Sequence, residues 1–364
     1  MATVAGAIVN GMSDFWLLAG QLALIAAVAG VVSYGLIVIL SASLARYALA
    51  QPNARSSHKK PTPQGGGIAV IGAILIVTGG GFLAGMDLND AHRLGMVLCA
   101  VILLGLVGAI DDARPLGAGP RLVLQIAVAI LVVAAIPPEL RIVYWLPVWL
   151  ERALVLLGAV WFINLVNFMD GIDWMSVAEI VPLTAGLTIF GLMGELPRDA
   201  TVVAAGLFGA ILGFAPFNRP VARLFLGDVG SLPVGLLLAW MLVLLATKGH
   251  FAAAILLPLY YLADATITLL HRFKRGAPIT EAHRDHFYQR AVDGGYTVYR
   301  VVGSVFLVNI VLAALAVAST FFDGSAEYQL ALLVIGSALV ATLIWGFAAA
   351  ERQTEPPSKK WPPQ

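Results

Sequence analysis

The sequence predicts an all-α fold, that of a polytopic integral membrane protein with about eleven transmembrane helices. Of the 364 residues, 60% are hydrophobic and 12% are charged, and the mean hydropathy is +0.89. Soluble domains carry about 25% charged residues. The longest loop between apolar stretches, 272–300, is too short for a separate soluble domain. We therefore expect one transmembrane domain over 1–350 and a Pro-rich, disordered cytoplasmic tail over 351–364.

Each predicted span is an apolar run near the length that crosses a bilayer, about 20 residues. The runs lie at 16–45, 66–85, 94–110, 121–138, 150–168, 174–193, 200–217, 230–247, 250–271, 300–320 and 327–349. The first run is too long for the apolar region of a signal peptide, and no Lys or Arg precedes Arg46. The single cysteine, Cys99, lies inside the third run and excludes an internal disulfide framework.

The distribution of basic residues predicts the orientation of the chain. If the N-terminus is outside, the loops 46–65, 111–121, 168–173, 218–229 and 272–300 and the C-terminal tail face the cytoplasm. These segments hold 17 of the 22 Lys and Arg residues. Cytoplasmic loops of membrane proteins carry an excess of Lys and Arg, so this orientation is favoured. It places every polar motif described below on one membrane face.

The first cytoplasmic loop, "QPNARSSHKKPTPQGGG", places Arg55, His58 and Lys60 before three glycines. One interpretation is a basic anchor followed by the start of a helix. The glycines favour another. A glycine run that opens a helix lets backbone N–H groups approach an anion closely, so the loop predicts a phosphate site.

The second loop, "GAIDDARPLGAGPR", has Asp111 and Asp112 at the end of the third apolar run. Adjacent carboxylates repel each other unless a cation or a proton is bound. Oxygen ligands of this kind suit Mg²⁺, which takes one or two carboxylates and completes its shell with water and phosphate. A solvated helix end is the alternative.

The stretch "NLVNFMDGID" follows directly on a membrane-type apolar run. Its polar residues are spaced by three, so a continuing helix would bring Asn164, Asn167, Asp170 and Asp173 roughly onto one face. Ionisable groups at such a depth are costly and by default suggest a functional site.

Two further loops add candidate residues. In "FNRPVARLFLGDVGS", Asp228 comes just before a helix, where an N-cap role is a sufficient explanation. In "EAHRDHFYQR", His283 and His286 are three apart and could bind a transition metal such as Zn²⁺. The interleaved arginines, Arg284 among them, favour contacts with phosphate, and a solvated basic loop is the alternative.

Together, these clusters indicate Mg²⁺-dependent phosphoryl transfer, in which positioning and charge neutralisation do most of the catalysis. A cation-coupled transporter is the main rival, but it predicts charges near the midplane and a repeat symmetry that we do not see. An intramembrane aspartyl protease is a second rival, suggested by "FLGD" and Asp264, although the full Gly-x-Gly-Asp signature is missing. For Asp264 we favour a structural partnership with a basic group.

The five motifs, in this order and over roughly 16–320, resemble the polyprenyl-phosphate N-acetylhexosamine-1-phosphate transferases. The stretches "SSHKKPTPQGGG" and "HRDHFYQR" look most like the branch that initiates O-antigen synthesis. The related peptidoglycan translocases carry adjacent histidines where this chain has Arg284 and Asp285 between its two. The role of each histidine therefore stays open.

The resemblance implies transfer of a sugar-1-phosphate from a UDP-N-acetylhexosamine to undecaprenyl phosphate, with release of UMP. It also implies Mg²⁺ or Mn²⁺ as cofactor, a multi-pass location in the bacterial cytoplasmic (inner) membrane, contact with membrane lipid, and no nucleic-acid partner. Which sugar is used, whether a phosphoryl-aspartate forms, and whether the chain is a homodimer stay open.

The resemblance also implies roles for single residues. The catalytic residues would be Asp111, Asp112, Asp228, His283 and His286. The metal would be bound by Asp228, with Asp112 and Asp170. Substrate would be bound by Arg55, His58, Lys60, Asn167, Asp170, Asp173, Asn218, Phe225 and Arg284. Among these, Phe225 would stack on uracil, Asn218 would contact the nucleotide, and "NLVNFMDGID" would line the nucleotide side of the site.

Overall fold

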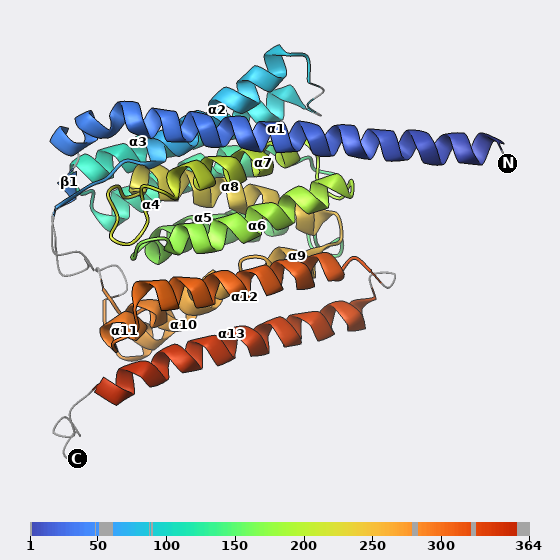
Figure 1. Cartoon of the computed structure of the whole chain (residues 1–364). Coiled ribbons are helices and arrows are strands. Elements are labelled where there is room, and N and C mark those ends of the chain that lie inside the picture. The colour runs from blue at the N-terminus through green and yellow to red at the C-terminus, as the bar shows by residue number, and fades with distance from the viewer. Residues whose placement is uncertain are drawn as a thin grey trace.

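The computed structural model describes residues 2–47, 49–50, 61–86, 88, 90–278, 283–321 and 325–354. Within them the chain is a bundle of α-helices (Figure 1). Eight helices are long and apolar enough to cross a membrane: α1 (Ala2–Tyr47), α3 (Ala91–Ala113), α4 (Ala118–Ala135), α5 (Val148–Met169), α6 (Met175–Leu192), α8 (Asp228–Thr247), α12 (Val298–Ala318) and α13 (Ala326–Thr354). The predicted all-α, polytopic membrane fold is thus confirmed.

The other three predicted spans are shorter helices. They are α2 (Gly67–Leu83), α7 (Arg198–Phe214), and a pair made of α9 (Phe251–Leu256) and α10 (Leu259–Lys274). The prediction of one continuous ninth helix was wrong, because the chain breaks at Leu257 and Pro258. Proline has no backbone N–H and its ring crowds the preceding turn, which favours a break here, although α6 and α8 continue through Pro182 and Pro233. A short helix, α11 (Phe287–Asp293), follows in the last large loop.

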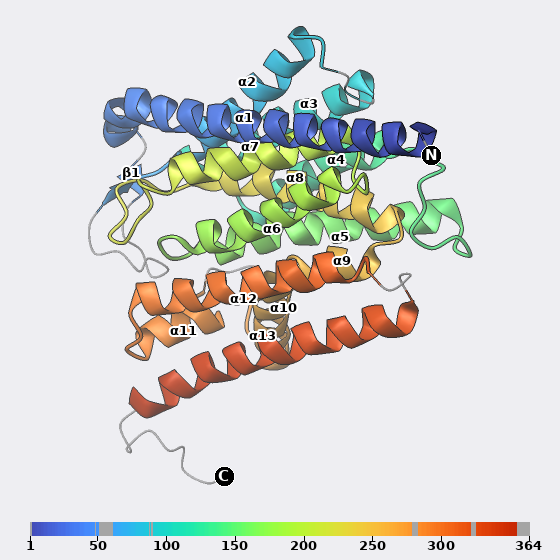
Figure 2. The same cartoon turned by 45° about the vertical axis from the view of Figure 1, so that its right-hand side comes forward.

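The bundle is layered around α8 (Figures 1 and 2). The views agree that α1 and α7 lie on one side of α8 and that α12 and α13 lie on the other. Helix α8 is buried along nearly its whole length, against α2, α3, α5 and α9. In Figure 1, α1 begins at the right-hand end and α13 finishes at the left-hand end. A chain that starts at one end of the bundle and finishes at the other passes along the bundle an odd number of times, as the eleven predicted spans require.

Small residues let α2 and α3 approach the N-terminus of α8 closely. A Cβ atom on Gly108 would lie 2.2 Å from the carbonyl oxygen of Asp228, and one on Gly67 would lie 2.1 Å from Cα of Gly230. Glycine at a helix crossing permits such contact between backbones. These crossings bring Asp111 and Asp112, at the end of α3, beside the first turn of α8.

The glycine run before α2 has a structural role that differs from the predicted one. Strands β1 (Leu49–Ala50) and β2 (Thr62–Pro63) form a two-residue antiparallel ladder, and the N–H of Phe225 donates to the carbonyl of Pro63 at 2.9 Å. The N–H groups of Gly66 and Gly67 donate to the carbonyls of Phe225 and Leu226. The expectation that this run receives phosphate was therefore wrong for these two amides, which already have backbone partners. The predicted basic residues Arg55, His58 and Lys60 lie outside the described residues.

Candidate active site at one end of the bundle

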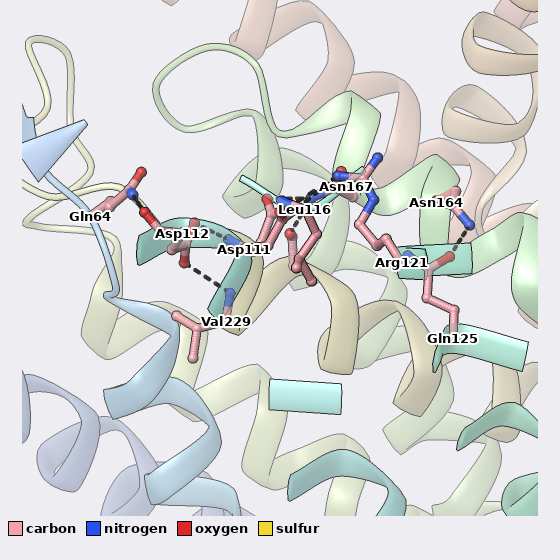
Figure 3. A network of polar contacts seen from close by, with 11 residues as sticks. Gln64, Asp111, Asp112, Leu116, Arg121, Gln125, Asn164, Asn167 and Val229 are labelled. Atoms are coloured by element: carbon pink, nitrogen blue, oxygen red, sulfur yellow. Dashed lines mark hydrogen bonds and ion pairs between the residues drawn. The ribbon is translucent and has the colours of Figure 1, made fainter. Parts of the chain in front are cut away.

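Two carboxylates from different helices face one guanidinium group; Figure 3 shows Asp111 and Arg121. Nη1 of Arg121 lies 2.9 Å from Oδ2 of Asp111 and 3.6 Å from Oδ2 of Asp228. Asp111 also accepts a hydrogen bond from the N–H of Leu116, and its side chain is 7% exposed, against 25% for Asp228. In the sequence, Arg121 serves only as one of the basic residues that predict the orientation of the chain. Its position one turn into the helix after the Asp111–Asp112 pair was the signal that could have identified it.

Asp112 has a different role from its neighbour. Its two carboxylate oxygens accept the N–H groups of Asp228 and Val229, at 3.0 and 3.1 Å. Gln64 donates its side-chain amide to the carbonyl oxygen of Asp112 at 3.0 Å (Figure 3). Asp112 thus caps α8 from another helix, where a carboxylate also interacts favourably with the helix dipole. The alternative that Asp228 itself caps α8 was wrong, since Gly227 is the cap residue and makes no side-chain bond.

The helix does not continue through "NLVNFMDGID", in agreement with the predicted loop at 168–173. Helix α5 ends at Met169 and Asp170 is its C-terminal cap, so the four polar residues do not share a face. Asn167 donates to Oδ1 of Asp228 at 2.7 Å and to the hydroxyl of Ser231 at 2.9 Å. Asn164 instead donates to Oε1 of Gln125 at 2.7 Å, away from the carboxylates (Figure 3).

Asp170 is half-buried and receives a 2.5 Å hydrogen bond from the hydroxyl of Ser176. Desolvation raises the pKa of Asp170 to about 7, although the Ser176 hydrogen bond opposes the shift; the nearby carboxylates of Asp112 and Asp173 raise it further. A carboxyl group with such a pKa changes charge near neutral pH. Its charge therefore responds readily to a cation or an anion that enters the site.

Asp173 and Asn218 hold two loops together. Asp173 accepts the N–H of Ala222 at 2.9 Å. Asn218 accepts the N–H of Trp174 at 2.8 Å and donates to the carbonyl of Leu224 at 3.0 Å. Trp174 has φ of 62°, a left-handed conformation that is strained for a bulky residue and needs such support. Both predicted nucleotide-site residues thus make loop contacts in this structure.

Asp264 contacts the loop that carries His283 and His286, called here the histidine loop. Its carboxylate accepts the N–H groups of Phe287 and Tyr288 and lies 3.1 Å from Nδ1 of His286. His286 is buried and stacks on His283, with ring centroids 5.0 Å apart. This contact agrees with the expected structural role of Asp264. The predicted substrate residue Arg284 forms an ion pair with Asp293 at 2.8 Å.

Tyr288 ties the histidine loop to the end of α5. Its hydroxyl donates to the carbonyl of Phe168 at 3.2 Å, and its ring stacks on His286. The structure thus brings the carboxylate cluster of Asp111, Asp112 and Asp228 together with Asn167. His286 is linked to the same end of the bundle because its ring stacks on Tyr288, which is hydrogen-bonded to Phe168.

Tyr288 also lies close to Gly171, so we expect Gly171→Ala to destabilise the protein. A Cβ atom at Gly171 would lie 2.2 Å from the Tyr288 hydroxyl oxygen, so Tyr288 must move. Overpacking of this kind costs about 1–3 kcal/mol, and we expect a lower melting temperature in detergent together with lower activity. Combining it with Tyr288→Phe should restore part of the stability. Gly158→Ala in α5, where a Cβ meets nothing within 4 Å, is the matched control; an equal loss there would contradict this explanation.

The donor set at the carboxylate cluster suits a hard divalent cation. Across the described ranges, no group of three or more His, Cys, Asp or Glu side chains has a metal-binding arrangement. Two carboxylates, Asp111 and Asp228, nevertheless lie near each other and near the positive charge of Arg121. Mg²⁺ needs only one or two carboxylates when water and phosphate complete its shell. The oxygens of Asp112, by contrast, face backbone N–H groups of α8.

The helix bundle and this cluster define a multi-pass membrane protein with an acidic site at one end of its helices, unlike the mid-bundle charges of the transporter alternative. Residues 94–246 match the model of glycosyl transferase family 4. This match agrees with the family predicted from the sequence, and the long apolar helices are those of a multi-pass membrane protein.

The similarity to curated relatives extends over most of the chain. The chain is 28% identical over 367 residues to the decaprenyl-phosphate N-acetylglucosaminephosphotransferase of Mycobacterium tuberculosis, with 89% of each chain covered. It is 25% identical over 307 residues to the probable undecaprenyl-phosphate N-acetylglucosaminyl 1-phosphate transferase of Bacillus subtilis, covering 80% of this chain and 84% of that one. The phospho-N-acetylmuramoyl-pentapeptide-transferase of Streptococcus pneumoniae is 29% identical over 234 residues, covering 58% and 71%.

Proposed function

We propose that the protein transfers an N-acetylhexosamine-1-phosphate from a UDP-sugar to undecaprenyl phosphate and releases UMP. This would be the initiating step of O-antigen or another cell-envelope polysaccharide in the bacterial inner membrane. The observation that carries the proposal is the pair Asp111 and Asp228 facing the guanidinium group of Arg121 at one end of the bundle. The relatives whose names specify polyprenyl phosphate and N-acetylglucosamine phosphate support the substrate classes.

The residues present fit a Mg²⁺ ion, which Asp228 and Asp111 would hold. When bound, the ion would neutralise the negative charge of the donor diphosphate. Asp112 would act by positioning, because it fixes the first turn of α8 and with it Asp228. Asn167 would orient the Asp228 carboxylate through its 2.7 Å hydrogen bond.

The remaining chemistry is electrostatic. A polyprenyl phosphate is an anion at neutral pH and needs little help from a general base, but it must approach a second anion. Arg121 lies at the carboxylate cluster and would supply positive charge there, as would the predicted Arg55, His58, Lys60 and the histidine loop. We expect the attack to take place at the cytoplasmic face.

The direct test is UMP release by the purified full chain. A panel of UDP-N-acetylhexosamines would be supplied with undecaprenyl phosphate in detergent, with Mg²⁺ or with a chelator. We expect release with at least one sugar, dependent on both the lipid and the metal. Release that needs no lipid phosphate, or no release with any sugar in a folded preparation, would contradict the proposal.

Phe225→Ala should weaken binding of the UDP-sugar. The backbone of Phe225 is fixed by Pro63 and Gly66, which sets the position of its half-buried ring. Stacking of a base on an aromatic ring is worth about 1–3 kcal/mol, so KM for the UDP-sugar should rise roughly 5- to 150-fold with a smaller change in kcat. Phe251→Ala, at the exposed start of α9, is the control. An unchanged KM in Phe225→Ala would exclude the stacking role.

The orientation can be tested independently of activity. A reporter fused after Gln364 should behave as cytoplasmic, and one inserted within 139–149 as external, because of the Lys and Arg bias of the loops. An external C-terminus would place the carboxylate cluster on the wrong side for a cytoplasmic nucleotide-sugar.

A further inference from the structure

A buried acid–amide pair joins α6 to α12, apart from the carboxylate cluster. Glu179 of α6 and Asn309 of α12 are each 1% exposed. The side-chain N–H₂ of Asn309 donates to Oε2 of Glu179 at 2.6 Å and to the carbonyl of Ala178 at 3.1 Å. None of these residues is part of the site described above.

Two buried polar atoms of this pair lack a hydrogen-bond partner within the part of the chain that the structure describes. They are Oε1 of Glu179 and Oδ1 of Asn309. If Glu179 were ionised, its Oε1 and the amide oxygen of Asn309 would both be acceptors, and neither could satisfy the other. Leaving such atoms unpaired away from water is costly, and an unpaired buried charge is costlier still.

One proton removes both problems. With a proton on Oε1, Glu179 is neutral and can donate to Oδ1 of Asn309, while Nδ2 of Asn309 already donates to Oε2. The carboxyl and carboxamide groups would then form two parallel hydrogen bonds. Among the described residues no ion pair involves Glu179; its interacting side chain is the neutral Asn309.

We propose that Glu179 and Asn309 form a proton-binding site inside the bundle, in which Glu179 holds a proton on Oε1 and this O–H donates a hydrogen bond to Oδ1 of Asn309. The site links the first turns of α6 to α12 and so supports the loop that precedes α6. The titratable group that faces Glu179 is Tyr261 of α10, which also interacts with Asp170 and Tyr288. The inference does not depend on the proposed function.

A monovalent cation is the competing occupant, since carboxylate, amide and hydroxyl oxygens can all ligate one. The geometry favours the proton. The amide N–H₂ of Asn309 points at the same carboxylate, and a donor directed at that oxygen competes with a cation for it.

Infrared spectroscopy of the purified full chain tests the proposal. At neutral pH, the wild type should show the C=O band of a protonated carboxylic acid that Glu179→Gln lacks and Asp170→Asn retains. Asn309→Ala should shift this band, because the acid loses its amide partner. The shift keeps the proposal testable if Glu179→Gln does not fold. Loss of no band in Glu179→Gln, or an unshifted band in Asn309→Ala, would overturn the proposal.

A second measurement separates a proton from a cation. The Glu179→Gln side chain can form both hydrogen bonds of the proposed pair without a titratable proton, so its stability should not change with pH through this site. The melting temperature of the wild type should fall relative to this variant as pH rises, because deprotonation leaves an unpaired charge in the bundle. A Na⁺-dependent rise in the melting temperature of the wild type, absent from Glu179→Gln, would instead identify a cation site.

Discussion

Asp228→Asn is expected to abolish transfer, lowering kcat by about 10²- to 10³-fold or more, while the protein stays folded. A metal-bound carboxylate supports several kcal/mol of charge stabilisation in the transition state, and each 1.36 kcal/mol is about tenfold in rate. The side chain is 25% exposed and Asp112 caps the helix in its place, so the substitution removes charge without removing the cap. UMP release and the melting temperature should be measured on the same preparation.

Asp90→Asn is the matched control for this loss. It makes the same chemical change at the opposite end of α3, where the carboxylate accepts only the N–H of Arg93 in addition to an exposed ion pair. We expect nearly full activity from it. Substantial turnover by Asp228→Asn would mean that the metal, or the charge it supplies, is held by other residues.

The sequence predicts the helices and the motifs well because both depend on local composition. Membrane-length apolar runs are set by the cost of exposing polar groups to lipid, and each predicted span corresponds to a helix, or to the broken pair α9 and α10. Pro258 is present within the predicted span 250–271, but a proline alone does not show whether the helix will break there. Its effect depends on neighbouring helices that can or cannot satisfy the freed carbonyls, which the sequence does not show.

The division of labour within the site depends on contacts between distant segments and could not be predicted. Arg121 lies ten positions from Asp111, but its second carboxylate, Asp228, comes from another helix. The end of α5 is contacted by Tyr288, whose hydroxyl lies beside Gly171 and donates to the carbonyl of Phe168. The spacing of the polar residues in "NLVNFMDGID" carries no information about that tyrosine.

Asp111 and Asp112 show the same limit most clearly, because the sequence treats them alike and the structure does not. Asp111→Asn should keep its hydrogen-bond acceptor for Leu116 but lose the charge that faces Arg121. We expect a fall in kcat of roughly 10²-fold with little change in KM for the UDP-sugar or in melting temperature.

Asp112→Ala should fail in another way. It leaves the N–H groups of Asp228 and Val229 without their carboxylate, and loss of a helix cap costs about 0.5–2 kcal/mol. The melting temperature should therefore fall, and activity should fall with it because the first turn of α8 is no longer fixed. Asp112→Asn keeps one oxygen acceptor and should lie between the wild type and Asp112→Ala in both measurements. If Asp112→Ala retained wild-type stability and lost only kcat, then Asp112 would act on the substrates directly, and the capping bonds would be incidental to its role.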